Sequence, residues 1–139
     1  MFLTTQNSTA PIETAPISMS RALDEVHGFT MATFYQTTSS KTATTILAMD
    51  IKSGSTDVNG WHINRQGDAI GAEVTREGVN ILDNDTSADG LRTGTLTPRD
   101  GKFHHIALTY DNITGTGSVY FDGVLQKQGN SRGFITGSN

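Results

Sequence analysis

The amino-acid sequence predicts an all-β fold, either a sandwich or a barrel, and three observations lead to that prediction. The 139 residues suffice for one domain with a single hydrophobic core. The low hydrophobic content of 35% and the 15 glycines favour short strands joined by many turns. Apolar residues alternate with polar ones in segments spaced about eight to twelve residues apart, and no long segment shows a helical period.

The N-terminal half is organised as an arm followed by strands. Residues 1–17 are polar and contain Pro11 and Pro16, so we expect an extended arm or edge segment there, with the domain proper over 18–139. Ser20 is placed to cap one helical turn over 20–26. Strands are expected over 29–36, 45–51, 61–66, 69–76 and 79–82, with loops over 38–44 and 52–60.

The most regular pattern lies near the C-terminal end. In 103–110 the residues Ile106 and Leu108 alternate with polar or small ones, and in 118–121 Val119 does the same. Directly after the second segment, Asp122-Gly123 supplies the positive φ angles of a tight hairpin turn, and Val124 resumes the pairing. The pattern therefore predicts a β-hairpin with its apolar face in the core.

This hairpin resembles a known family. The stretch "FHHIALTYDNITGTGSVYFDGVL" is similar to the central motif of laminin-G-like, concanavalin A-like lectin/glucanase domains, and the resemblance extends more loosely over residues 18–128. It implies an antiparallel jelly-roll β-sandwich. The family's closing strand has no clear counterpart in "GFITGSN": either Phe134–Thr136 is a short version of it, or another chain or domain supplies it.

Charge and composition exclude several classes of function. The net charge is −4 and basic residues are scattered, so nucleic acid is not an expected partner. The absence of cysteine excludes disulfides and thiolate metal sites. The first twenty or so residues lack both a basic start and an apolar run, so we expect neither a signal peptide nor membrane insertion.

Two adjacent histidines, His104 and His105, invite a catalytic or metal-binding interpretation. Neighbours in a strand point to opposite faces, so the two imidazoles cannot chelate one ion. No nucleophile, triad or carboxylate pair is suitably spaced near them. We therefore expect a structural role for both histidines and no catalytic residues.

A glycan-binding surface is expected on one face of a sheet. Tyr35, Trp61, Asn64 and Arg65 are the candidate ligand-binding residues, because aromatic and polar groups on a rigid sheet hold sugars in lectin-type domains. Trp61 alternates with Ile63, and that pattern favours a core position over sugar stacking. The sequence leaves open which sheet face is concave.

The loop "DNDTSADG" is the candidate metal site. Asp83, Asp85, Ser87 and Asp89 alternate oxygen ligands, which suits calcium. Ala88 and Gly94 stand where an EF-hand-type loop needs a glycine and a bidentate glutamate. A solvated acidic loop without metal is therefore the favoured alternative.

Three functions follow from these observations. The leading hypothesis, implied by the resemblance, is a non-catalytic recognition module that binds a glycan or protein surface outside the cell, at a cell surface or on a virion. The alternative is a structural subunit of an extracellular or virion assembly, a homo-oligomer or part of a larger particle. The third is a glucanase-like glycosidase, for which the strands offer only Asp50 and Glu73.

Overall fold

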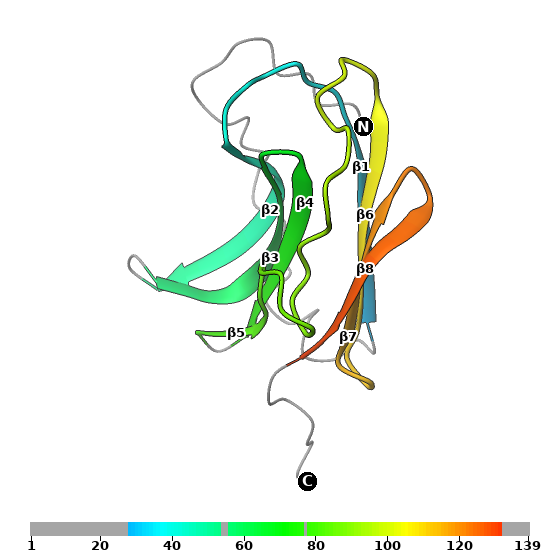
Figure 1. Cartoon of the computed structure of the whole chain (residues 1–139). Coiled ribbons are helices and arrows are strands. Elements are labelled where there is room, and N and C mark those ends of the chain that lie inside the picture. Colours follow the sequence, from blue (N-terminus) through cyan, green and yellow to red (C-terminus); the bar gives the residue numbers. More distant parts are fainter. Residues whose placement is uncertain (1–27, 54–55, 77, 132–139) are drawn as a thin grey trace, which may run out of the picture.

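The structure is a computed structural model that describes residues 28–53, 56–76 and 78–131, with only the backbone described for 50–53 and 56–59. Every regular element among them is a β-strand, and the strands form two facing layers (Figure 1). Their bounds are β1 Gly28–Tyr35, β2 Ala43–Ser53, β3 Thr56–Gln66, β4 Ala69–Arg76, β5 Val79–Leu82, β6 His104–Asp111, β7 Thr116–Phe121 and β8 Val124–Asn130. No helix in this part of the chain is long and apolar enough to cross a bilayer.

Each layer is a four-stranded antiparallel sheet. One has the strand order β1-β6-β7-β8 and the other the order β2-β3-β4-β5. The two orders show that β1 crosses to pair with β6, whereas β2 to β5 form a meander. The predicted all-β sandwich is therefore confirmed, and the hairpin of β6 and β7 lies in the middle of its sheet.

The core fills the space between the sheets. The sheet of β2–β5 contributes Ile63, Ile70 and Val74, and the other contributes Leu108 and Val119, all of them buried. Burying a side chain of this size stabilises the fold by about 1.5–3 kcal/mol before entropy is counted. The apolar face predicted for the C-terminal hairpin is the face that packs on the opposite sheet.

The turn between β7 and β8 has the predicted conformation. Asp122 has a φ of 51° and Gly123 a φ of 78°, as a two-residue hairpin turn with two left-handed positions requires. This turn pairs Phe121 with Val124 and so sets the register of the edge strand β8.

Most strand predictions are confirmed to within two residues, but one loop was wrong. Residues 52–60 were expected to form a loop, whereas β2 continues to Ser53 and β3 begins at Thr56. This polar segment lacks an apolar alternation, yet its backbone pairs across a long hairpin, so strand pairing outweighs the local pattern. The arm 1–17, the turn 20–26 and the segment Phe134–Thr136 lie outside the described residues.

The connection from β5 to β6 runs along the open side of β4. Ala72 N–H donates to Leu91 O at 3.3 Å and Thr93 N–H donates to Ile70 O at 2.9 Å, so this segment extends the sheet beyond the short strand β5. Leu91 and Thr93 are buried on the inner side. Arg92, between them and bridged to Gly71, consequently faces outward.

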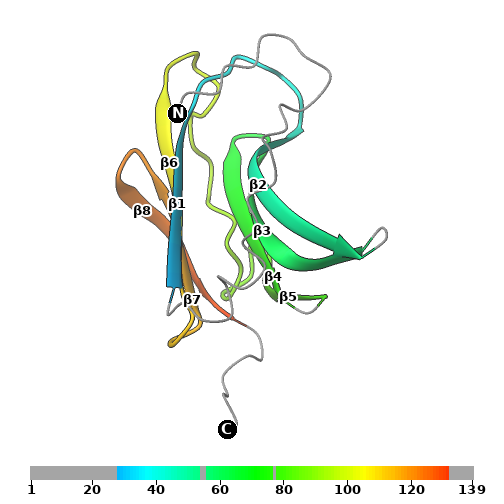
Figure 2. The same ribbon diagram turned by 180° about the vertical axis from the view of Figure 1, so that it is seen from behind.

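The two sheets differ in curvature. In Figure 1 and in the reverse view of Figure 2, β2 and β3 bend away from the other sheet toward the end that joins them. The outer face of the β2–β5 sheet is therefore concave, which settles a point that the sequence left open.

Candidate functional site: a polar cluster on the concave face

The concave face is lined by the outward-facing residues of β3 and β4. Ile63 and Ala72 are cross-strand partners that face the core, so the neighbouring pairs, His62 with Glu73 and Asn64 with Gly71, face outward. His62 Nε2 lies 3.7 Å from Glu73 Oε2, with about a quarter of each side chain exposed.

Asn84 and Arg92 join this face from the loop after β5. Asn84 Nδ2 donates to Asn64 Oδ1 at 2.6 Å, and Arg92 Nε donates to Asn84 Oδ1 at 3.2 Å. Arg92 Nη2 also donates to the backbone oxygen of Asn84. We call His62, Asn64, Glu73, Asn84 and Arg92 the concave-face cluster.

Gly71 makes room for this network. A β-carbon added at Gly71 would lie 1.7 Å from Asn84 Oδ1, a distance that no side chain tolerates. The missing side chain lets the Asn84 amide lie directly over the strand, between Asn64 on one side and Arg92 on the other. A glycine at position 71 is therefore needed to leave space for the cluster, and not to form a turn of the backbone.

The cluster combines a cation with several hydrogen-bonding groups. Among the described residues, Arg92 uses Nε and Nη2 and leaves Nη1 without a partner. A guanidinium held in this way is pre-organised to bind a carboxylate with directed hydrogen bonds. The amides of Asn64 and Asn84 and the carboxylate of Glu73 add acceptors and donors of the kind that sugar hydroxyls use.

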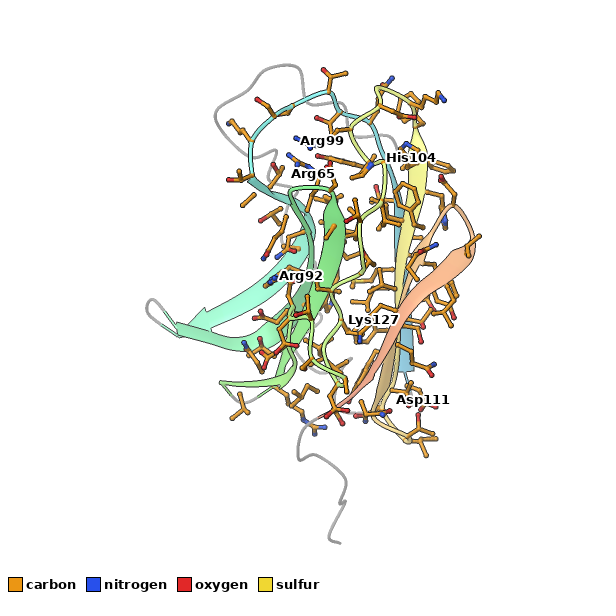
Figure 3. The ribbon with its side chains drawn as sticks, viewed as in Figure 1. Arg65, Arg92, Arg99, His104, Asp111 and Lys127 are labelled. Atoms are coloured by element: carbon orange, nitrogen blue, oxygen red, sulfur yellow. The ribbon has the colours of Figure 1, made fainter. Side chains whose placement is uncertain are left out.

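Of the four predicted ligand-binding residues, the structure places only Asn64 on this face. Arg65 is fully buried at 0% exposure, because it is the strand neighbour of Asn64 and points the opposite way (Figure 3). Its Nη1 donates to Gly67 O and its Nη2 to Lys41 O, both at 2.7 Å. The placement of Arg65 beside Asn64 on one sheet face was therefore wrong.

Tyr35 and Trp61 lie on the inner side as well. The hydroxyl of Tyr35 accepts a hydrogen bond from Arg65 Nε at 3.3 Å. Trp61 is partly buried against the core, with its ring centroid 6.3 Å from that of Phe29, as its alternation with Ile63 favoured. No observation tests a ligand role for these residues, so that role stays a prediction.

The acidic loop is held by its own side chains. Asp85 Oδ1 accepts from both the backbone N–H and the hydroxyl of Ser87, at 3.0 and 2.6 Å, while Asp83 O accepts from Leu91 N–H at 2.8 Å. No three acidic, histidine or cysteine side chains of the described residues gather closely enough to hold a metal, and Asp89 is exposed. No observation tests calcium binding by this loop, so it stays a prediction.

His104 lies between two carboxylates at the opposite end of the sandwich from the β6–β7 turn. Its Nδ1 is 2.7 Å from Asp122 Oδ2 and its Nε2 is 2.9 Å from Asp100 Oδ1. Burial acts to lower the pKa of His104, but the hydrogen bonds and charges of Asp122 and Asp100 outweigh it, so the pKa is raised.

The pKa values of both aspartates shift in the opposite direction to that of His104. The hydrogen bond from His104 lowers the pKa of Asp122, and the backbone N–H of Lys102 together with His104 lowers the pKa of Asp100. Both imidazole nitrogens are thus engaged, and His105 points to the other face against Phe34. This geometry agrees with the structural role expected for the pair.

Sequence reasoning placed only Asn64 among the candidate ligand-binding residues and left out the other members of the concave-face cluster, which are His62, Glu73, Asn84 and Arg92. Glu73 was considered only as a catalytic carboxylate, although its alternation with Ala72 puts it on the face opposite to that residue. Arg92 carries no comparable signal, because its position depends on how an irregular loop docks beside β4.

A family model described as the concanavalin A-like lectin/glucanases superfamily matches residues 8–139. The chain therefore belongs to the concanavalin A-like lectin/glucanase superfamily, and the resemblance seen in the C-terminal hairpin is confirmed. No curated protein matches the chain.

Two solved structures share the fold. Both are of the carbohydrate-binding module CBM40 of the Ruminococcus gnavus IT-sialidase, one of them bound to α2,3-sialyllactose. Each has 16% sequence identity and a TM-score of 0.58, and each alignment covers 81% of this chain. The chain spans 58% of the length of those modules, so the similarity concerns the fold.

Proposed function

We propose that this chain is a non-catalytic carbohydrate-binding module that holds a glycan on its concave face. The observation that carries the proposal is the concave-face cluster, in which a cation, two amides and a carboxylate lie on one curved sheet face. The superfamily and the carbohydrate-binding modules of like fold support it at the level of class. Such a module works outside the cell, at a cell surface or on a virion.

Arg92 indicates the chemistry of the glycan. A half-buried guanidinium with Nη1 directed at no described residue favours a ligand with a carboxylate, and glycans that end in a sialic acid carry one. The CBM40 module of like fold binds α2,3-sialyllactose, which supports this choice of ligand. We therefore propose acidic, sialylated glycans as the ligand class, with Asn64 and Glu73 binding sugar hydroxyls.

A binding role is favoured over glycoside hydrolysis. Hydrolysis by the common mechanism needs two carboxyl groups on either side of the scissile bond. Asp50 and Glu73 belong to β2 and β4, which are separated by β3. Glu73 contacts His62 within the sheet, an arrangement that suits a fixed hydrogen-bonding group.

Isothermal titration with 3′-sialyllactose and with lactose tests the proposal. We expect binding of sialyllactose and much weaker binding of lactose, which lacks the carboxylate. Arg92→Ala removes a charge-assisted hydrogen bond worth about 1.5–3 kcal/mol, so affinity should fall by roughly 10- to 150-fold. Arg99→Ala is the matched control, because Arg99 pairs with Asp68 away from the cluster.

The folded state of each variant is checked by circular dichroism before titration. Equal affinity of the wild type and Arg92→Ala for sialyllactose would overturn the assignment of the ligand to this face. Equal binding of lactose and sialyllactose would overturn the role given to the carboxylate.

A second candidate function, a subunit of a larger assembly, is favoured by one surface. On the outer face of the other sheet Phe34 is 61% exposed and Leu125 is 48% exposed, and Phe34 contacts His105. Exposed apolar groups on a sheet face are typical of protein contacts. A homo-oligomer by light scattering that Phe34→Ser returns to a monomer would support this function, and a wild-type monomer would exclude self-association through this surface.

A further inference from the structure

We propose a second carbohydrate site, for neutral sugar chains, on the outer face of the β1-β6-β7-β8 sheet. This site goes beyond the proposed function, because it lies on the opposite side of the sandwich from Arg92 and does not depend on the concave-face cluster. It is built from a groove, a row of polar side chains in register and a lining without cations.

The groove lies over the end of the sheet near Asp111, which is labelled in Figure 3. Its volume is about 520 Å³, within the range of ligand-binding clefts. Within the groove lining, one outward residue of each of the four strands lies at the same level of the sheet. These residues are Thr30, Thr109, Ser118 and Gln128.

The four side chains form a straight row across the sheet. Thr30 pairs with Thr109, Thr109 with Ser118, and Ser118 with Gln128. Because neighbouring strands lie about 4.8 Å apart, the row spans about 14 Å. A row of this length can follow an extended oligosaccharide that lies across the strands.

The row offers both donors and acceptors to sugar hydroxyls. Gln128 Nε2 donates to Ser118 Oγ at 3.1 Å, which orients the amide and leaves its oxygen as an acceptor. Among the described residues the hydroxyls of Thr30 and Thr109 form no hydrogen bond, although both residues line the groove. Each hydroxyl can therefore donate to and accept from a ligand.

The next row along the sheet is small and aromatic. Ala32 pairs with Ala107, and Ala107 with Tyr120. The two alanines leave the surface low beside the polar row, and the ring of Tyr120 provides an edge against which the apolar face of a sugar can pack. Polar groups beside a low apolar floor match the two kinds of surface that a sugar ring presents.

The charge of the lining selects a neutral ligand. The groove contains no Lys or Arg, and its one ionisable carboxyl group is that of Asp111. Oδ1 of Asp111 accepts hydrogen bonds from the backbone of Ile113 at 2.8 Å and of Thr114 at 3.4 Å, so the carboxylate is fixed at the groove. A lining without Lys or Arg offers no cation to bind the carboxylate of an acidic sugar, in contrast to the site around Arg92.

Chemical-shift mapping on the ¹⁵N-labelled chain tests the proposal with three probes, cellohexaose, maltohexaose and mannohexaose. We expect at least one of them to shift the amides of Thr30, Thr109, Ser118 and Gln128, with no shifts around Arg92. The double variant Thr30→Val/Thr109→Val keeps size and strand preference but removes two hydroxyls. Its affinity should fall about 25-fold, or about fivefold for each lost hydrogen bond.

The matched control is Thr95→Val, an exposed threonine outside the groove, whose affinity should equal that of the wild type. The proposal is overturned if none of the three probes shifts the groove amides, or if the double variant binds as tightly as the control. A parallel titration with 3′-sialyllactose reports on the concave face separately, so failure at one face is distinguishable from failure at the other.

Discussion

Replacing Arg65 by alanine is expected to lower the free energy of unfolding by about 3–6 kcal/mol, the sum of two charge-assisted hydrogen bonds. Arg65 is fully buried and donates to the backbone oxygens of Gly67 and Lys41, both at 2.7 Å. It thereby ties the β3–β4 turn to the segment just before β2. Truncation removes both bonds and leaves two acceptors without their donor.

A loss of this size is a large share of the roughly 5–15 kcal/mol that holds a typical domain together. Urea denaturation followed by tryptophan fluorescence measures it, since Trp61 is the single tryptophan. Arg99→Ala is the control, because its ion pair with Asp68 is partly exposed and screened by solvent, so its loss should lower the free energy of unfolding far less than the loss of Arg65. Equal stabilities of the two variants would refute the structural role assigned to Arg65.

Three further predictions concern other parts of the molecule. In the folded protein the pKa of His104 is raised and the pKa values of its two aspartate partners are lowered, so their contribution to stability is complete from about pH 4 to 6.5. This contribution to stability should decline as pH rises through the folded pKa of His104, and also as pH falls through the folded pKa values of Asp100 and Asp122. The variant His104→Gln should therefore flatten a plot of melting temperature against pH. A variant plot identical to that of the wild type would contradict this prediction. Gly71→Ala should displace Asn84 and weaken sialyllactose binding about as much as loss of one hydrogen bond, roughly fivefold, with a melting temperature within a few degrees of the wild type; unchanged affinity would show that Asn84 is not needed. Millimolar calcium should leave the melting temperature unchanged because loop 83–90 is closed by its own hydrogen bonds, and a rise that EDTA reverses would restore the calcium site.

Local patterns account for the parts of the fold that were predicted. The alternation around Leu108 and Val119 places those side chains in the core, and the left-handed pair Asp122-Gly123 joins two strands at a fixed register. Both signals act over a few residues, so they can be recognised without knowledge of the rest of the chain. The end at which β2 and β3 join, residues 52–60, has no such pattern and was predicted as a loop.

The site was less predictable than the fold because it depends on contacts between distant segments. Strand alternation alone separates Asn64 from Arg65, and applying it strictly would have removed Arg65 from the surface. Arg92 reaches the concave face only because its loop docks beside β4, where Gly71 leaves space for Asn84. No short-range signal in the sequence reports such a docking.

A crystal structure of the chain with 3′-sialyllactose tests the central claim most directly. We predict density for the sugar on the outer face of the β2–β5 sheet, with its carboxylate within hydrogen-bond distance of the Arg92 guanidinium. Sugar density bound elsewhere on the molecule, or a carboxylate directed away from Arg92, would contradict the account.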